Sequence, residues 1–220
     1  MKMANHLAKD NWTDIERVQR MAKTYTMRYD IDFWKTFLSL TSSEPRHVVA
    51  DFGCGPGLFL ADIANRFKAH TAIALDESSQ MLAVAETNLK ELTKLKSIEI
   101  RLVNFDTDKI DIESGSIDFA FSGFMLHEVA DSRKFVSVVH RLVKLMGTYV
   151  VYDYVSGNEE QFVKAMVKNG LSEEHARKRY PHMCKHSAAD IKEILETSGF
   201  SNCQSQTIDE YRAVVVGLKR

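Results

Sequence analysis

The stretch that decides the fold runs from residue 48 to residue 64 and reads Val48-Val49-Ala50-Asp51-Phe52-Gly53-Cys54-Gly55-Pro56-Gly57-Leu58-Phe59-Leu60-Ala61-Asp62-Ile63-Ala64. An apolar run ends at an acidic residue, three glycines follow at alternate positions, and apolar residues then recur at helical spacing. This order predicts a strand, a tight turn and a helix. Glycine permits backbone torsions that a Cβ forbids, and it lets a ligand approach the main chain at the amino end of the helix.

The spacing of the glycines separates two kinds of nucleotide site. The dinucleotide fingerprint Gly-x-Gly-x-x-Gly needs its third glycine one residue later, where this chain has Leu58. The run instead resembles the first motif of Rossmann-like (class I) S-adenosylmethionine-dependent methyltransferases, acidic-x-Gly-x-Gly-x-Gly, which Asp51, Gly53, Gly55 and Gly57 match in full. For this stretch alone, a structural turn or another nucleotide site remains an alternative.

Composition and charge limit the class of protein. The 220 residues suffice for one α/β domain, and 27% charged and 45% hydrophobic residues are typical of a globular protein. A net charge of -1 provides no field that would attract nucleic acid or an anionic membrane. The three cysteines are too few and too scattered for a disulfide framework, and no apolar run has the length of a membrane span. We therefore expect a cytoplasmic monomer or homodimer with no nucleic-acid or membrane partner.

Three further strand ends carry residue types that the resemblance assigns to the cofactor. Asp76 ends a predicted strand at 71–75 and is placed to accept hydrogen bonds from ribose hydroxyls, although a helix cap is the alternative. Asn104-Phe105-Asp106 ends the predicted strand 97–103 and implies adenine binding, with a loop cap as the alternative. Phe105 replaces the small or polar residue usual there. The cofactor-binding residues implied by the resemblance are Asp51, Gly53, Gly55, Gly57, Asp76, Glu77, Met81 (which core packing would also explain), Asn104, Phe105, Asp106 and Ser122.

The segment after the predicted strand 117–121 is expected to line the acceptor side, because ligands of such sheets bind beyond the carboxyl ends of the strands. His127 lies in this segment, and contact with the acceptor, general-base catalysis and support of the loop are all open to it. A predicted strand at 148–152 leads Asp153 and Tyr154 to the same edge. The predicted acceptor pocket comprises Tyr29, Gly123, His127, Asp153 and Tyr154, and the candidate catalytic residues are His127 and Tyr25.

The order of the predicted elements, together with the resemblance, gives the fold class. We expect an α/β protein, a Rossmann-like three-layer sandwich with a seven-stranded, mostly parallel sheet whose last strand is antiparallel. Residues 1–45 are predicted to form a helical cap, and residues 46–220 the cofactor-binding domain, with a helical insertion at 156–187. A helix is predicted at 135–145, ended by Met146-Gly147.

The histidines and basic residues between residues 175 and 186 have two interpretations, a solvated helix face or a contact for an anionic acceptor. These histidines lack the paired cysteines of a zinc site, so no metal is expected.

The resemblance implies that the protein moves a methyl group from S-adenosylmethionine to oxygen, nitrogen or carbon of a small molecule, leaving S-adenosylhomocysteine. Because such a transfer depends mainly on orientation and exclusion of water, a general base is not obligatory. Two alternatives are a non-catalytic S-adenosylmethionine-binding regulatory or assembly protein and a methyltransferase acting on a macromolecule. Residues 122–125 read Ser-Gly-Phe-Met, not the Pro-Pro-Tyr motif that marks methylation of base or glutamine amino groups.

Overall fold

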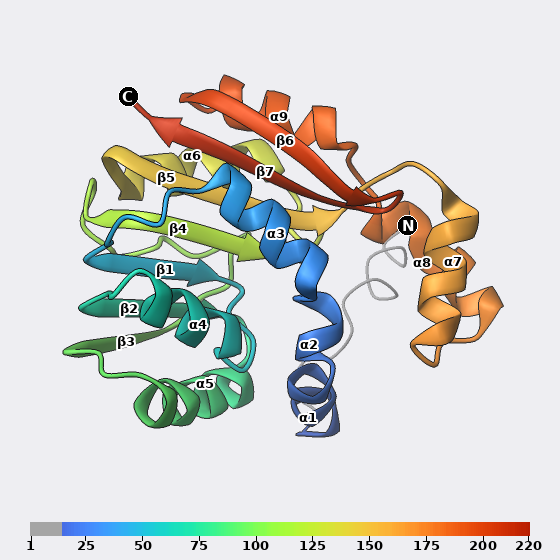
Figure 1. The fold of residues 1–220 in the computed structure, drawn as a ribbon, viewed down its shortest axis with the longest axis horizontal. Coiled ribbons are helices and arrows are strands. Elements are labelled where there is room, and N and C mark those ends of the chain that lie inside the picture. The colour runs from blue at the N-terminus through green and yellow to red at the C-terminus, as the bar shows by residue number, and fades with distance from the viewer. Residues whose placement is uncertain (1–14) are drawn as a thin grey trace.

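A computed structural model describes residues 15–220 and shows one sheet with helices on both faces (Figure 1). The strand order is β3-β2-β1-β4-β5-β7-β6. Every pairing from β3 to β5 is parallel, and β7 runs antiparallel to both of its neighbours, which confirms the predicted fold class. The strands are β1 (Val48–Phe52), β2 (Thr71–Asp76), β3 (Ser97–Leu102), β4 (Ile117–Gly123), β5 (Val143–Tyr154), β6 (Phe200–Asp209) and β7 (Arg212–Lys219).

Several helices of the described part begin at a residue whose side chain caps them. Ser78, Asp131 and Ser172 each accept a hydrogen bond from a backbone N–H of the helix that follows, and Ser187 forms a capping box with Asp190. The helices are α1 (Ile15–Lys23), α2 (Tyr25–Arg28), α3 (Ile31–Leu40), α4 (Leu58–Arg66), α5 (Ser79–Leu92), α6 (Ser132–Leu142), α7 (Glu159–Lys168), α8 (Glu173–Met183) and α9 (Ala188–Thr197). None of the helices within residues 15–220 has the length and apolar character needed to cross a bilayer.

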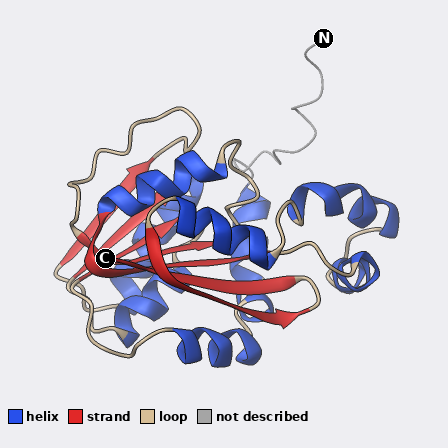
Figure 2. Cartoon of the chain, turned by 90° about the horizontal axis from the view of Figure 1, so that it is seen from above, coloured by secondary structure: helices blue, strands red, loops and turns tan. Residues whose placement is uncertain are grey.

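Two hydrophobic cores lie on opposite faces of the sheet. One contains Phe33 and Phe37 of α3 together with the buried faces of α4 and α5. The other joins the buried faces of α6 and α9 to the sheet. The pair α7–α8 has its own small cluster around Phe162 and stands away from the layers at one end (Figure 2). The core is thus built from apolar faces on both sides, which leaves the strand ends as the place for a site.

The predicted helix at 135–145 is wrong at its carboxyl end. Helix α6 stops at Leu142, and β5 already begins at Val143, which pairs with Ile117 of β4. Gly147, a predicted helix end, instead lies in the irregular part of this strand. A Cβ there would meet Val143 Cγ1 at 2.6 Å and Ile117 O at 3.1 Å. A strand that starts with an irregularity lacks the period-two pattern by which a strand is predicted.

The amino-terminal helices lie partly on one face of the sheet and partly beyond its carboxyl edge. Helix α3 packs on β6 and β7, whereas α1 and α2 continue past the carboxyl ends of the central strands towards α5 (Figure 1). Most of the predicted segment 1–45 is therefore helical where the structure describes it. Its first 14 residues lie outside the described part.

Candidate active site

The parallel strands β1, β2, β4 and β5 end at one edge of the sheet, and the predicted site residues lie there. The strand order reverses direction between β1 and β4, which is where an open α/β sheet provides a ligand crevice. Helices α1 and α2 stand on one side of this edge and α7–α8 on the other (Figure 1).

The glycine turn is held in a conformation that glycine favours. Gly53 has φ +83° and Gly55 has φ +51°, and the N–H groups of Gly53 and Cys54 both donate to Leu75 O of β2, at 2.8 and 2.9 Å. Gly57 also has a positive φ, +74°, and in addition a Cβ there would meet Ala85 Cβ of α5 at 2.8 Å. The motif therefore combines a tight turn, formed by its first two glycines, with a close helix contact at the third.

Asp76 is bonded to the glycine turn itself. Its Oδ2 accepts from the N–H of Gly55 at 2.8 Å, and its Oδ1 accepts from the N–H of Ser78 at 2.9 Å. Burial raises the pKa of Asp76, and these two N–H groups oppose that rise. Of the two residues able to cap α5, Asp76 and Ser78, it is Ser78 that does so. A carboxylate oxygen has two lone pairs, so each oxygen can also accept from a ribose hydroxyl.

Asp51 is a buried carboxyl group with an incomplete set of partners. It is 2% exposed, and its Oδ1 has no hydrogen-bond partner among the described residues. Burial raises the pKa of Asp51 well above its ordinary value, and the Asp76 carboxylate adds to the rise. An unsatisfied buried acceptor is costly unless a ligand completes it. The ammonium group of a bound S-adenosylmethionine is such a ligand, so the residues at this edge fit the cofactor.

The loop after β3 is joined to the loops on either side of it. Asn104 Oδ1 accepts from the backbone N–H of Asp106 at 3.0 Å, and Asp106 Oδ1 accepts from Ala130 N at 2.8 Å. Glu77 Oε1 accepts from Phe105 N at 3.2 Å. The predicted adenine residues thus lie together with Glu77, and Asp106 also links this loop to the turn after β4. Their contact with adenine stays a prediction.

Two predicted cofactor residues have side chains engaged in the protein interior. The hydroxyl of Ser122 is buried and lies 2.8 Å from the Tyr149 hydroxyl of β5. Met81 is 1% exposed in the first turn of α5, as expected for a core residue. Their contact with the cofactor is likewise a prediction.

His127 lies in the turn after β4 with a carboxylate near each ring nitrogen. Its Nδ1 is 2.6 Å from Asp153 Oδ1, and its Nε2 is 3.2 Å from Glu128 Oε1. Burial lowers the tendency of the ring to take a proton, but the two carboxylates outweigh this and raise the pKa of His127 to about 9. At neutral pH His127 is therefore a cation, which does not accept a proton as a general base would.

Glu128 extends this network to α8, and sequence analysis missed it. Its Oε2 is 3.2 Å from Nε2 of His182, a residue of the insertion. Burial alone would raise the pKa of Glu128, but the hydrogen bonds from His127 and His182 lower it to about 2. Glu128 is next to His127 in the sequence, but the pattern gives no sign that the insertion supplies its second partner. Other residues of the basic run also have structural partners. Arg177 pairs with exposed Glu160 and Glu173. Lys185 donates to Val129 O at 3.0 Å, and His186 Nε2 lies 3.0 Å from Ser132 Oγ.

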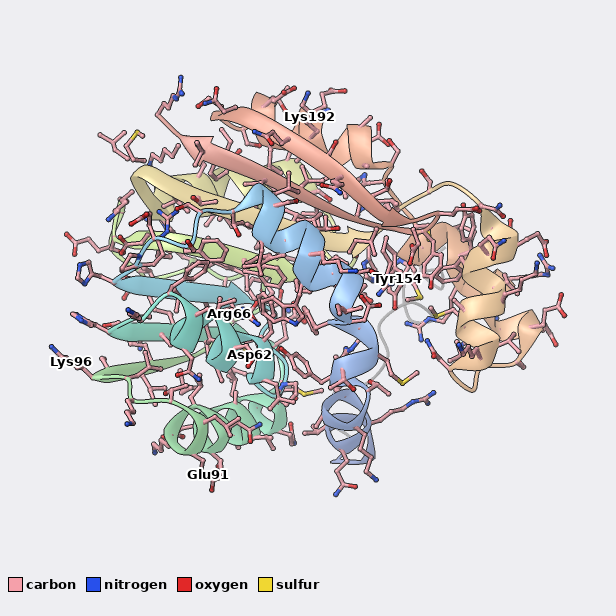
Figure 3. All side chains as sticks on the ribbon, in the orientation of Figure 1. Asp62, Arg66, Glu91, Lys96, Tyr154 and Lys192 are labelled. Carbon is pink, nitrogen blue, oxygen red and sulfur yellow. The ribbon has the colours of Figure 1, made fainter. Side chains whose placement is uncertain are left out.

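Aromatic side chains surround the ends of β4 and β5, where the acceptor is predicted to bind. A Cβ on Gly123 would occupy the place of the Tyr29 hydroxyl, so these two predicted pocket residues do come together. Tyr154 has its ring centroid 4.5 Å from Phe124 and 5.6 Å from Phe162 of α7. Figure 3 shows Tyr154 between the amino-terminal helices and α7–α8.

Tyr25, the second candidate catalytic residue, points to another helix. Its hydroxyl donates to Asp62 of α4, which Figure 3 also labels. Burial raises the pKa of Tyr25, and the bond to Asp62 adds to the rise. This arrangement ties α2 to α4, and a catalytic role of Tyr25 stays a prediction.

The fold and this set of strand-end residues define the Rossmann-like class of S-adenosylmethionine-dependent methyltransferases. A family model described as a methyltransferase domain matches residues 50–151, which contain all of the predicted cofactor-binding residues. The chain thus contains a segment that matches a methyltransferase domain, and it has the fold of the S-adenosylmethionine-dependent methyltransferases.

Known proteins similar to this chain support the assignment. Phosphoethanolamine N-methyltransferase 2 of Caenorhabditis elegans is 26% identical over 75% of this chain, which spans only 35% of that protein. Malonyl-[acyl-carrier protein] O-methyltransferase of Marinomonas sp. is 27% identical over 93% of this chain and 74% of its own length. The crystal structure of a methyltransferase from Aquifex aeolicus has the same fold, with a TM-score of 0.71, 19% identity, and coverage of 94% of this chain and 99% of that one.

Proposed function

We propose that this enzyme methylates a small-molecule acceptor, which meets the methyl group between the amino-terminal helices and α7–α8. The observation that carries the proposal is the enclosure of the β4 and β5 ends. Tyr29 of the amino-terminal segment contacts Gly123, and Tyr154 of β5 contacts Phe162 of the insertion. Small ligands bind preferentially among hydrophobic and aromatic side chains such as these. In this proposal, residues 1–45 act as a cap and residues 156–187 contribute to the acceptor pocket.

S-adenosylmethionine, when bound, supplies a methyl group on a positively charged sulfur. The protein's own part is to orient the two reactants and to exclude water, which can contribute about 7–11 kcal/mol to lowering the barrier. Asp76 holds the glycine turn through Gly55, and the orphaned oxygen of Asp51 would receive the ammonium. The cationic His127 fixes the turn after β4 against Asp153 and is a hydrogen-bond donor, so it is a positioning residue in this proposal.

The acceptor atom is a separate question. By their names, the two similar proteins methylate nitrogen of a phosphorylated amine and oxygen of a carrier-bound acid. We favour a free small molecule because the acceptor side is enclosed by aromatic residues from three segments, as described above. A carrier-bound or macromolecular acceptor is the outcome that would overturn this choice.

The test uses S-adenosylmethionine with a labelled methyl group. The purified enzyme is incubated separately with the small-molecule, protein and nucleic-acid fractions of one cell extract. We expect label in the small-molecule fraction, and we expect Tyr154→Ala to reduce transfer while leaving the Kd of the cofactor within about threefold. Label confined to a macromolecular fraction contradicts the proposal. So does tight cofactor binding without transfer to any fraction, which is the result for a regulatory protein.

Cofactor binding is tested with Asp76→Ala. Hydrogen bonds to a charged group contribute about 1.5–3 kcal/mol, so titration calorimetry with S-adenosylhomocysteine should show a Kd raised at least tenfold. Glu91→Ala is the control, because Glu91 is an exposed acidic residue on α5. An unchanged Kd in Asp76→Ala would exclude Asp76 as a cofactor residue.

A further inference from the structure

Arg28, the last residue of α2, is a cation without an ionic partner in the described part of the chain. Its Nη1 donates to Met21 Sδ at 3.0 Å and its Nη2 to Met21 O at 2.7 Å. Its Nε is buried and has no partner among the described residues. A guanidinium offers five donors, and placing it among neutral groups is costly unless an anion arrives.

The neighbouring Arg212 shows how the same region satisfies a structural arginine. Its Nη2 lies 2.9 Å from Asp30 and its Nε 2.7 Å from Asp209, and its Nη1 donates to the Tyr152 hydroxyl at 3.0 Å. Carboxylates are thus available beside α2, but none of the described ones pairs with Arg28. Arg28 thus keeps a buried N–H donor that a ligand can satisfy.

Arg28 lies close to the cofactor turn. Its partner Met21 has the atom nearest to the place that a Cβ on Gly55 would take, Cε at 3.9 Å. The adjacent Tyr29 is influenced by charges of both signs. Burial raises the pKa of the Tyr29 hydroxyl, the Asp51 carboxylate raises it further, and the Arg28 guanidinium lowers it. The charges of Asp51 and Arg28 thus both reach the Tyr29 hydroxyl.

The methionine part of the cofactor is an α-amino acid with one positive and one negative group. We propose that Arg28 binds the carboxylate of this amino acid and Asp51 its ammonium. The orphaned oxygen of Asp51 accepts from the ammonium, and the Nε edge of Arg28 can donate two parallel hydrogen bonds to the carboxylate. The proposal depends on the cofactor and not on the identity of the acceptor.

The competing assignment is an anionic group on the acceptor. Arg28 also lowers the pKa of Tyr154, which burial raises to about 12, so its charge reaches the acceptor side as well. The two assignments differ in what Arg28 does to cofactor affinity. If Arg28 binds the acceptor, its removal leaves the Kd of the cofactor unchanged. If Arg28 binds the cofactor carboxylate, its removal raises the Kd only of ligands that carry this carboxylate.

Titration calorimetry with two ligands separates these cases. S-adenosylhomocysteine carries the carboxylate, and decarboxylated S-adenosylmethionine lacks it. For Arg28→Met, which keeps the apolar bulk, we expect the Kd of S-adenosylhomocysteine to rise at least tenfold. The Kd of the decarboxylated ligand should stay within about twofold of that of the unmodified protein, which also shows that the variant is folded. For Arg28→Lys, which keeps the charge but lacks the planar guanidinium group, the Kd of S-adenosylhomocysteine should lie between the values for the unmodified protein and for Arg28→Met.

Arg20→Met is the control for loss of a cation near the same helices. Arg20 is exposed on α1, and its Nη2 donates to Asn169 O at 3.1 Å. Its removal should leave both affinities unchanged. Unaltered S-adenosylhomocysteine binding in Arg28→Met overturns the proposal, and so does an equal loss for both ligands.

Discussion

At the scale of single residues, the charge on His127 couples stability to pH. The pKa of His127 is raised from 6.5 to about 9 in the folded protein, so between these pH values the folded state binds a proton that the unfolded state has released. The stabilisation of the folded protein by protonated His127 is therefore complete below pH 6.5 and is lost as the pH rises towards 9. We expect the free energy of unfolding to fall over this window by on the order of 3 kcal/mol.

Urea unfolding at pH 6.5, 8 and 9 measures this change. His127→Gln should abolish most of the fall, whereas His175→Gln, an exposed residue on α8, should leave it unchanged. His140 and His186 do not add to it, because burial lowers their pKa values and so moves their effect below pH 6.5. If the unmodified protein and His127→Gln lose stability equally between pH 6.5 and 9, the His127–Asp153 pair does not carry the charge described above.

The residues of the site were more predictable than their partners. Asp51, Asp76, Asp106 and His127 could be predicted because each follows an apolar run at a strand end, and the fold brings parallel strand ends together. The bond from Gly55 to Asp76 and the contact of Glu128 with His182 depend on side-chain positions in space. Arg28, which we propose as a cofactor ligand, was not predicted because a single arginine at the end of a four-residue helix has the pattern of any exposed cation.

At the scale of elements, Gly57 sets the distance between α4 and α5. Gly57 has φ +74°, and a Cβ there would lie 2.8 Å from Ala85 Cβ and 2.9 Å from Ala85 Cα. Gly115 has nearly the same backbone angle, φ +71°, but no atom lies within 4 Å of its would-be Cβ. The two glycines therefore separate the effect of the backbone angle from the effect of packing.

Substitution by alanine should reduce the free energy of unfolding by different amounts at Gly57 and at Gly115. Gly115→Ala should reduce the free energy of unfolding by about 1 kcal/mol, the cost of a left-handed residue with a Cβ. Gly57→Ala should lose about 1–3 kcal/mol more, because α5 has to move. Urea unfolding measures both, and equal losses would contradict the packing explanation. Since α5 follows Asp76, Gly57→Ala should also weaken S-adenosylhomocysteine binding, and Gly115→Ala should not.

Element types were predicted well, and one boundary was not. The strands predicted at 71–75 and 97–103 follow clear periodic patterns, and they agree with β2 and β3 within one residue at each end. At residues 143–147, Val143 and Leu145 continue the apolar pattern of α6, so the sequence alone favours a longer helix. The pairing of Val143 with Ile117 is a long-range contact that local periodicity does not contain.

At the scale of the whole molecule, the chain's first described helices are bonded to its last hairpin. Arg212 of β7 donates to the backbone oxygen of Arg28 at 3.3 Å, and the Tyr152 hydroxyl of β5 donates to the same oxygen at 2.7 Å. The ion pair between Arg212 and Asp30 adds a third link at the start of α3. The predicted fold class contained no strand order, so the sequence did not indicate that these two parts of the chain meet. Nor did it indicate which residues connect them.

Arg212→Met should therefore loosen the amino-terminal helices from the sheet. Arg212 is 12% exposed, and breaking a buried pair from one side leaves carboxylates without their cation, so we expect a loss of about 3 kcal/mol in the free energy of unfolding. Limited proteolysis should cut the variant within residues 15–30 faster than the unmodified protein. Saturating S-adenosylhomocysteine should slow this cleavage, because a ligand at 100 times its Kd stabilises the folded protein by about 2.7 kcal/mol.

Arg66→Met tests whether the effect is specific to Arg212. The Arg66 guanidinium of α4 lies 4.1 Å from the centre of the Trp34 ring of α3, so it also joins the amino-terminal helices to the rest of the protein. Arg66 is exposed, and such a cation–π contact contributes about 0.5–1 kcal/mol. Proteolysis of Arg66→Met within residues 15–30 should remain close to that of the unmodified protein. Equal cleavage rates for the two variants would mean that the ion pairs of Arg212 do not hold these helices on the sheet.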